Sequence, residues 1–366
     1  MYAPPGYLLW VEGDALLGQA FDATRLQLSG QPFTVAEGVG RSMTFQGAVF
    51  ASHTGTLAYT GAVLRIGSLQ WFDRTGSPIG AIGPEADYVD FRFSPDEKRL
   101  AASLGDPKSG TPDIWLTELA TGRTTQLTFG PSINAAATWS PDGAQLVFRK
   151  LAGGVIEFYQ KSAAGGGDEQ PLLGAESQHA AGISAINLVP SDWSPDGRNI
   201  IFSVPTVVSG YDLWLLPMAG DRKPVRFLAS PGDQLHPNFS PDGRLVAYTS
   251  NESGRFEVYV QTFPRSDRKW QISIDGGYEP RWRADGREIY YLSEDRRLMA
   301  VAVGAGPSFD APKPLFQTRV PAVVHANRRN YVPTRDGRRF LINTQTTDVG
   351  PNPITIVLNW TAGLKK

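Results

Sequence analysis

The stretch Trp139-Ser-Pro-Asp-Gly-Ala-Gln-Leu-Val-Phe148 decides the fold of this chain, because the same phrase returns at regular intervals. It combines an aromatic residue, a Ser-Pro-Asp-Gly turn and a hydrophobic strand. Intact or nearly intact copies begin at Phe93, Trp193 and Phe239, and worn copies begin at Trp282 and Thr334. Two degraded copies lie upstream, so the glycine or its equivalent occupies positions 6, 55, 97, 143, 197, 243, 286 and 337.

Each repeat is about 47 residues long on average and contains segments of β-strand composition. A strand such as Leu146-Val-Phe follows the turn, and a second strand such as Asp212-Leu-Trp-Leu follows a polar loop. A weaker third strand leads to a fourth, which carries the next aromatic residue. A period in the forties with four short strands is typical of a propeller blade. The sequence therefore predicts an all-β propeller of four-stranded blades.

The number of blades follows less directly from the eight repeat units. The first unit lacks a clear strand before Gly6, and the last unit lacks a fourth strand after Ile354–Trp360. A propeller can complete one blade from two distant parts of the chain, which protects the sheet edges. We therefore expect a single propeller domain over residues 1–366 with seven or eight blades. The alternative is a six-bladed ring with two extra repeat units.

The turn chemistry explains why the phrase repeats. Proline sets the first central φ of the turn, glycine takes a positive φ, and aspartate bonds nearby backbone N–H groups. A residue type that recurs in every unit serves the architecture. We therefore assign a structural role in the turns to Asp96, Asp142, Asp196, Asp242, Asp285 and Asp336.

Composition excludes several classes of protein. Thirty-five Lys and Arg balance 36 Asp and Glu, for a net charge of -1, so the chain is not a bulk electrostatic binder of nucleic acid or of an anionic membrane. It contains no cysteine, which removes thiolate nucleophiles and Cys-based metal sites. The apolar runs are far shorter than the ~20 residues of a membrane span. We expect no membrane contact by this chain and a monomeric state.

The Trp-Ser-Pro-Asp-Gly units, with strands such as Glu257-Val-Tyr-Val, resemble the WD40-like (PD40) repeat of TolB-type propellers. Stretches such as Gly220-Asp-Arg-Lys-Pro-Val and the ending Val357-Leu-Asn-Trp-Thr-Ala-Gly-Leu-Lys-Lys are also similar to the C-terminal propeller region of acidobacterial-type bacterial serine/threonine kinases. This resemblance implies an extracytoplasmic sensor module, with a cytoplasmic location still open. The chain carries no kinase motif, so kinase activity does not transfer to it.

A search for catalytic motifs finds none: no Gly-x-Ser-x-Gly, no phosphate-binding loop and no His-Glu-x-x-His. The four histidines, His53, His179, His236 and His325, fall in separate units, and we interpret them as ordinary loop or surface residues. Arginines gather near the C-terminus, and we interpret them as a solvated face rather than an anion patch. We predict no catalytic residues, no metal ligands and no cofactor.

A ligand, if bound, is expected on the channel rim opposite the Asp-Gly turns, where loops enter the strand before each turn. The candidate residues there are Tyr88, Asp90, Asn134, Asn187, His236, Tyr278, Glu279, Arg328 and Arg329. The sequence thus favours a non-catalytic module that binds an unidentified protein, peptide or glycan. The alternatives are a lactonase-, lyase- or glycosidase-like enzyme using His236, Glu279 or Asp90, and a structural spacer.

Overall fold

The computed structural model describes residues 1–12, 15–39, 49–61, 66–106, 111–183, 187–206, 210–321, 324–346 and 354–363. The chain divides into two compact units. The six-sheet unit comprises Ile66–Gly105 and Thr111–Thr346, and the two-sheet unit comprises Met1–Arg65, Asp106–Gly110 and Thr347–Lys366. The all-β class is confirmed, since the described strands form eight sheets, as many as there are repeat units.

The six-sheet unit is built from antiparallel sheets of four main strands, which we number outward from the channel. The first strands are β9 (Tyr88–Phe93), β13 (Ile133–Trp139), β17 (Val189–Trp193), β21 (Gln234–Phe239), β25 (Tyr278–Trp282) and β30 (Tyr331–Pro333). The second strands are β10 (Arg99–Gly105), β14 (Gln145–Ala152), β18 (Asn199–Thr206), β22 (Leu245–Ser250), β26 (Glu288–Leu292) and β31 (Arg339–Gln345).

The outer half of each sheet follows the same order. The third strands are β11 (Pro112–Glu118), β15 (Val155–Ser162), β19 (Gly210–Pro217), β23 (Glu257–Thr262), β27 (Arg297–Gly304) and β7 (Gly67–Asp73). The fourth strands are β12 (Thr124–Gln126), β16 (Gln170–Leu173), β20 (Val225–Leu228), β24 (Lys269–Gln271), β29 (Lys313–Gln317) and β8 (Pro78–Ala86). The short β28 (Ser308–Phe309) also pairs with β27, and helix α1 (Ala175–Ala180) follows β16.

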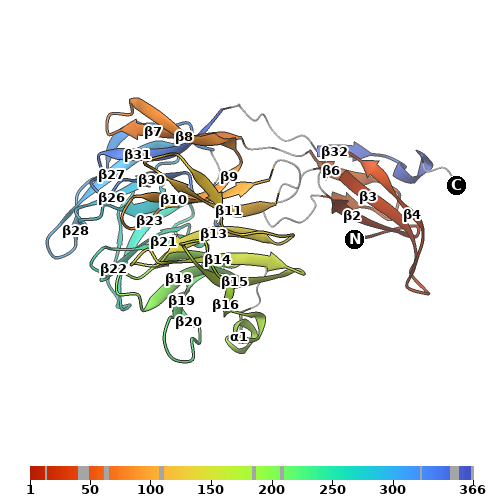
Figure 1. The fold of residues 1–366 in the computed structure, drawn as a ribbon, viewed down its shortest axis with the longest axis horizontal. Coiled ribbons are helices and arrows are strands. Elements are labelled where there is room, and N and C mark those ends of the chain that lie inside the picture. Colours follow the sequence, from red (N-terminus) through yellow and green to blue (C-terminus); the bar gives the residue numbers. More distant parts are fainter. Residues whose placement is uncertain are drawn as a thin grey trace. The chain divides into compact units, whose positions relative to one another are not determined.

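The six sheets form a closed ring. Neighbouring first strands contact one another from β9 through β25, and β30 contacts β9. The Tyr331 hydroxyl on β30 donates to the backbone oxygen of Glu279 on β25, 2.8 Å away, which joins the last pair. The closing sheet has the order β30-β31-β7-β8, with Arg339 opposite Asp73 and Gln345 opposite Gly67. In Figure 1 the blue β31 lies beside the orange β7.

The two-sheet unit holds the remaining strands. One sheet contains β1 (Tyr2–Ala3), β2 (Tyr7–Glu12), β3 (Ala15–Asp22) and β4 (Gln27–Ala36). The other contains β5 (Val49–Ala51), β6 (Leu57–Thr60) and β32 (Ile354–Val357), in the order β32-β6-β5, and the 3-10 helix η1 (Trp360–Gly363) follows β32. Leu9, Leu57 and Trp360 belong to their common core.

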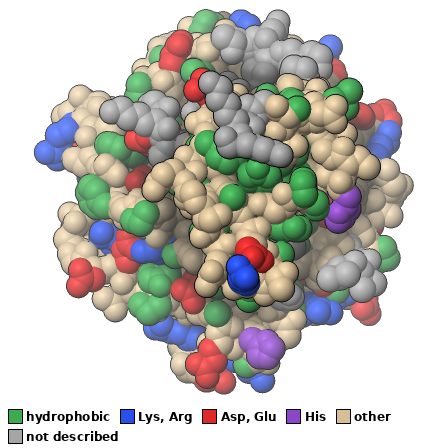
Figure 2. Space-filling model, turned by 90° about the vertical axis from the view of Figure 1, so that its right-hand side faces the viewer, with side chains coloured by type: hydrophobic (Ala, Val, Ile, Leu, Met, Phe, Trp, Pro, Cys, Tyr) green, Lys and Arg blue, Asp and Glu red, His purple; other side chains and the backbone are tan. Residues whose placement is uncertain are grey.

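One row of side chains in this unit stays exposed. Phe50, Ala58 and Ile356 are aligned across the three strands of the second sheet, and Phe50 and Ile356 are largely exposed. In the space-filling view of Figure 2, hydrophobic side chains, coloured green, reach the surface between polar ones.

The division into two units differs from the single domain expected from the repeat spacing, and strand exchange explains it. The second repeat supplies β5 and β6 to one unit and β7 and β8 to the other, whereas the last repeat supplies β30 and β31 to one and β32 to the other. Six sheets therefore close on themselves, and two are left over. Of the two arrangements that the sequence left open, this is the six-bladed ring with two extra repeat units.

The repeated turns lie between the first and second strand of each sheet. In the turn after β13, the Ser140 hydroxyl donates to Asp142 Oδ1 at 2.5 Å, and that oxygen accepts the backbone N–H of Ala144 at 3.0 Å. All six turn aspartates accept the backbone N–H two residues later. Gly143 has φ +70°, a conformation that side chains disfavour, which accounts for the glycine.

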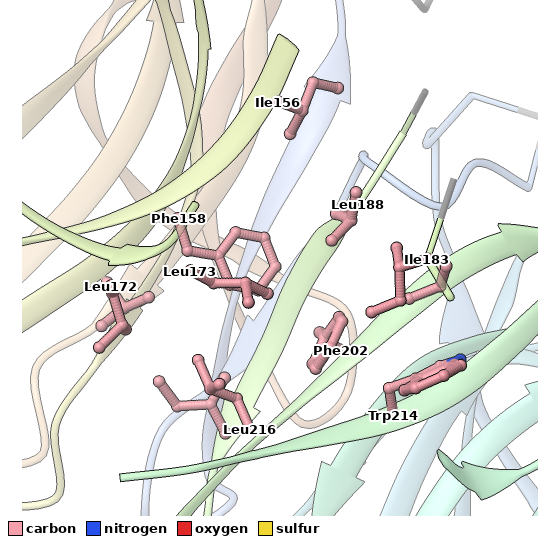
Figure 3. Packing of buried hydrophobic residues seen from close by; sticks show 12 residues of the cluster. Ile156, Phe158, Leu172, Leu173, Ile183, Leu188, Phe202, Trp214 and Leu216 are labelled. Carbon is pink, nitrogen blue, oxygen red and sulfur yellow. The ribbon is translucent and has the colours of Figure 1, made fainter. Parts of the chain in front are cut away.

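Hydrophobic clusters between neighbouring sheets form the core. Between the sheets of β13–β16 and β17–β20, the Phe158 and Phe202 rings meet edge to face, with centroids 5.3 Å apart (Figure 3). The repeated aromatic residues also join sheets: Trp139 Nε1 donates to the Arg92 backbone oxygen, and Trp282 Nε1 to that of Asn238. Side chains that point toward the neighbouring sheet thus bury both faces of each sheet.

The turn aspartates predict how stability depends on acidity. Hydrogen bonds from Ser94, Ser140 and Ser194 hold the pKa of Asp96, Asp142 and Asp196 below the ordinary value of 3.8. A lowered folded-state pKa gives stability that is present above the unfolded pKa and lost as the pH falls through the folded one. Replacing the three serines by alanine is therefore expected to flatten the dependence of the free energy of unfolding on pH below about 4.

Urea unfolding at a series of pH values between about 5 and 2.5 measures this dependence. At neutral pH the alanine variant is expected to be less stable by about 1 kcal/mol per lost hydrogen bond. An acid limb as steep as that of the wild type would contradict the role assigned to the serines.

Candidate functional site

The candidate site lies in the channel of the six-sheet unit and begins with a ring of side chains that we call the collar. Each first strand contributes its second-to-last residue. In five of the six strands, the last residue is the repeated aromatic one. The collar residues are Arg92, Thr138, Asp192, Asn238, Arg281 and Val332. Five of the six are polar, and each comes from a different sheet, so the ring is polar on most of its circumference.

Neighbouring collar residues bind one another along one half of the ring. Arg92 Nη1 donates to Thr138 Oγ1 at 3.1 Å and lies 3.8 Å from Asp192 Oδ1. Asn238 Nδ2 donates to Asp192 Oδ2 at 2.7 Å. Asp192 therefore binds its neighbour Asn238 and also pairs with Arg92, one position further round the ring.

The other half of the collar is open. Arg92 Nε and Nη2 have no hydrogen-bond partner among the described residues, and the carboxylate oxygen Asp90 Oδ2 lies 3.9 Å from Nε. Arg281 donates to the Pro280 backbone oxygen at 3.2 Å and forms no salt bridge with any described carboxylate. Val332, between these two arginines in the order of the sheets, brings no polar group. Two guanidinium groups therefore flank a collar position that lacks an acceptor.

Deeper in the channel lies a buried cluster of charges around Arg329. Asp90 Oδ1 is 3.1 Å from Arg329 Nε, and both side chains are almost fully buried. Glu279 Oε2 accepts the backbone N–H of Asn330 at 2.8 Å, and Oε1 accepts the Asn330 amide at 2.6 Å. Burial raises the pKa of Glu279, opposed by the Asn330 hydrogen bonds and the charges of Arg281 and Arg329. Arg329 thus joins the segment before β30 to Asp90 of β9, and its charge also acts on Glu279 of β25.

Backbone irregularities place these groups. Ala136, His236 and Glu279 occupy the same repeat position and have φ values of +56°, +52° and +54°. The strand register shifts at each of these places, which marks a β-bulge. His236 Nε2 lies 2.7 Å from the His325 backbone oxygen. Burial and the charge of Arg329 lower the pKa of His236 well below its ordinary value, so this imidazole is neutral at neutral pH.

The channel end where the first strands begin is filled by amides. Arg149 Nη1 donates to Asn187 Oδ1 at 2.5 Å, and Asn187 Nδ2 donates to the Tyr211 hydroxyl at 2.7 Å. Asn327 Nδ2 also donates to Asn187 Oδ1. Burial lowers the pKa of Arg149 to about 10. Asn134 Nδ2, from the neighbouring sheet, donates to Asp113 at 2.9 Å.

All nine candidate residues are buried, so none is an open rim side chain. Asp90, Glu279 and Arg329 lie in the charge cluster. His236 is close enough for the charge of Arg329 to lower its pKa. Tyr88 and Tyr278 instead belong to hydrophobic clusters between sheets. Arg328 pairs with Asp87 at 2.8 Å, beside the Tyr88 backbone. The channel interior rather than a solvated rim is therefore where the candidates meet.

A pocket of about 280 Å³ opens next to the collar, on the side of the repeated turns. We call it the turn-face pocket. Arg92, Asn238, Arg281 and Val332 of the collar line it. Its walls are polar and apolar in about equal parts, and they come mainly from the first strands and turns of β9, β25 and β30. The larger apolar side chains among them are Phe91, Phe93, Pro95, Trp282 and Pro333. The pocket therefore lies at the opposite channel end from the predicted rim.

Comparison with known proteins agrees with this architecture. Tol-Pal system protein TolB of Francisella tularensis subsp. holarctica (strain OSU18) is 27% identical over 174 residues, which cover 46% of this chain. The match spans only 37% of that relative's length. The protein of the same name from subsp. mediasiatica (strain FSC147) is 26% identical over the same length. No family model matches the chain.

Solved structures show the same fold. A putative TolB from Agrobacterium tumefaciens superposes with a TM-score of 0.57 at 17% identity, covering 77% of this chain and 99% of that one. TolB from Acinetobacter baumannii gives 0.55 at 19% identity, covering 85% and 80%. The fold is that of a TolB-like β-propeller. An oligogalacturonate lyase in complex with manganese gives 0.52 at 13% identity, covering 96% and 95%, so the fold is shared with an enzyme as well.

Two further observations bear on what a TolB-like propeller of this sequence can hold. Within the described parts of the chain, no three His, Asp or Glu side chains are grouped as metal ligands. No helix in those parts is long and apolar enough to cross a membrane.

Sequence reasoning missed the collar of this TolB-like propeller. Four collar residues directly precede a repeated aromatic residue: Arg92, Asp192, Asn238 and Arg281. The sequence interpretation considered only the turn that follows each aromatic residue. Aligning the six repeats on that aromatic position would have shown polar residues in five of them. A run of polar residues at one strand position of a mostly buried strand is the signal that could have found the collar.

Proposed function

We propose that this chain is a non-catalytic binding module whose TolB-like propeller takes a segment of a protein partner at the channel of the six-sheet unit. The observation that carries the proposal is the collar, where two buried nitrogens of Arg92 have no hydrogen-bond acceptor among the described residues. Burying a polar group without a partner is unfavourable, so such groups are commonly satisfied by a ligand or by water. The relatives named for a Tol-Pal system support a protein as partner.

The resemblance of the sequence to kinase-linked propellers supports a finer proposal. In this proposal the chain is the extracytoplasmic ligand-sensing region of a bacterial membrane receptor kinase. The stretches around Gly220 and Val357 carry this resemblance. A coding sequence in which a kinase domain and a membrane span precede these residues would support it, and an independent gene would contradict it.

A photo-crosslinking amino acid placed at Val332 tests the binding proposal in the cells that make the protein. Val332 lines the turn-face pocket, whereas Val225 lies exposed on the outer strand β20 and provides the matched control position. We expect one protein to crosslink from position 332 and not from position 225, and the purified pair to bind in solution. Equal labelling from both positions, or capture of a glycan alone, would contradict a protein ligand at the channel.

The enzymatic alternative rests on the buried Asp90, Glu279 and His236. Asp90 is paired with Arg329, and both Glu279 oxygens and the His236 Nε2 already have protein partners. This engagement favours a structural role, since a general acid or base must reach the substrate. Metal analysis of the purified protein separates the two proposals: a stoichiometric metal ion, together with turnover of a lactone or glycan, would favour the enzyme.

A further inference from the structure

We propose that the turn-face pocket binds a carboxylate side chain, an Asp or Glu of an extended peptide, between Arg92 and Arg281. This inference rests on the proposed binding function and adds the chemistry of the ligand. The pocket and the open half of the collar carry it together, because both arginines line the same cavity. Guanidinium groups bind carboxylates through short, charge-assisted hydrogen bonds.

The available donors match one carboxylate. Arg92 is 12% exposed at its side chain and keeps two nitrogens without a hydrogen-bond partner among the described residues. Arg281 is buried, and its one hydrogen bond to a described residue goes to the Pro280 backbone. A carboxylate has two oxygens, so one group can accept from both arginines at once.

The charge balance favours a single negative charge. Three arginines, including Arg335, and one glutamate, Glu97, line the pocket, which gives a net charge of +2. Asp192 lies 3.8 Å from Arg92 and reduces this to +1. Asp90 lies 3.9 Å from the same guanidinium, but its charge is matched by that of Arg329, 3.1 Å away. A carboxylate neutralises that charge, whereas a phosphate of about −1.5 to −2 would exceed it. The pocket therefore suits an acidic side chain better than a phosphorylated one.

The walls indicate what should accompany the carboxylate. Phe93, Trp282 and Pro333 present apolar surface around the arginines. Excluding water from a charge pair strengthens it, and these walls can also bury a neighbouring apolar residue of the ligand. The recognised segment is thus an acidic residue next to an aromatic or aliphatic one.

The equivalent positions of the collar residues in the six sheets allow the anion site to be tested by a substitution in the chain itself. Collar residues of adjacent sheets contact each other, as Arg92 does with Thr138 and Asp192 with Asn238. A glutamate in place of Val332 should therefore lie beside Arg92 on one side and Arg281 on the other. The Val332→Glu variant supplies the missing carboxylate, and Val332→Gln is the control of equal size without the charge.

We expect the melting temperature of Val332→Glu to exceed that of Val332→Gln by about 2–4 °C, and the gain to disappear at high salt. A glutamate variant that melts at or below the glutamine variant would overturn the inference. Neither result requires a known partner, so this measurement is independent of the proposed function.

Peptide binding provides the second arm, with a random 12-residue display library selected on the full wild-type chain. We expect enriched peptides to share an Asp or Glu beside an apolar residue. Affinity should fall roughly 10- to 100-fold in Arg92→Met and in Arg281→Met. Arg123→Met, an exposed turn residue, is the matched control.

Enriched peptides that lack acidic residues, or that bind both methionine variants as well as the wild type, would overturn the inference while leaving the proposed function standing. If no peptide binds and Val332 crosslinks no protein, the proposed function fails as well. A glutamate variant that is stabilised under those conditions would still support an anion site.

Discussion

Replacing Glu279 by leucine is expected to lower the free energy of unfolding of the six-sheet unit by about 3–5 kcal/mol. Glu279 is fully buried and accepts two hydrogen bonds from Asn330, across the boundary between the sheets that close the ring. Leucine would leave the Asn330 donors without acceptors and would remove one of the acids that face Arg329. Breaking half of a buried charge network costs more than the whole network contributes.

Urea unfolding followed by tryptophan fluorescence measures this loss. The matched control is Glu85→Leu on the outer strand β8, where the side chain is exposed and the change is expected to stay within about 0.5 kcal/mol. Glu279→Gln, which keeps an acceptor for Asn330, should fall between the two. A leucine variant as stable as the wild type would show that the charge cluster contributes nothing at the ring closure.

Replacing Phe202 by alanine is expected to cost about 3–5 kcal/mol as well, for an entirely apolar reason. Phe202 is fully buried between two sheets and meets Phe158 edge to face. Figure 3 shows its ring among Leu188, Ile183 and Trp214. Alanine removes the ring from a close-packed site, and the cavity left behind adds to the lost transfer free energy.

The control for this variant is Phe129→Ala, which removes the same ring from an exposed position of the same unit. Its midpoint of unfolding should stay close to that of the wild type. Trp193 and Trp214 belong to or pack against the Phe202 cluster, so fluorescence reports on the affected region. If the two alanine variants unfold alike, the interface between these sheets is not a principal source of stability.

The turn phrase was sufficient to predict the class of fold and the four-stranded repeat. Its chemistry is local: the Ser140 hydroxyl, Asp142 carboxylate and Gly143 conformation all act within a few residues. The order of strands within a sheet also follows the chain from β13 to β16. Short-range patterns of this kind can be read from a sequence.

The partition into rings could not be predicted in the same way. Whether β7 pairs with its own repeat or with β31 depends on interactions between segments far apart in the chain. Either pairing would satisfy the same backbone N–H and C=O groups of β7. The spacing of the repeats therefore cannot distinguish the two pairings. The observed pairing assigns β7 and β31 to one unit and β6 and β32 to the other.

The candidate site was predicted in part. The position of the loops that enter the first strands predicted Asp90, Glu279 and His236 at the channel rim, and the structure places them inside the channel near Arg329. The bulges at His236 and Glu279, however, turn these side chains toward protein partners, and a bulge leaves no reliable sequence signal. Arg92 and Arg281 were not predicted as site residues, because their role depends on side chains of the neighbouring sheets.

The pairing of β7 with β31 also sets an order of events during synthesis of the protein. Gly67 leaves the ribosome long before its partner Gln345, roughly 15–55 s earlier at the ~5–20 residues per second of translation. During that interval β7 and β8 form a hairpin with an unpaired edge, while five other sheets can form beside it. An unpaired strand edge is a template for wrong pairing. The first sheet elements of this unit to be made are therefore the last to be secured, and they are where a nascent chain most needs protection.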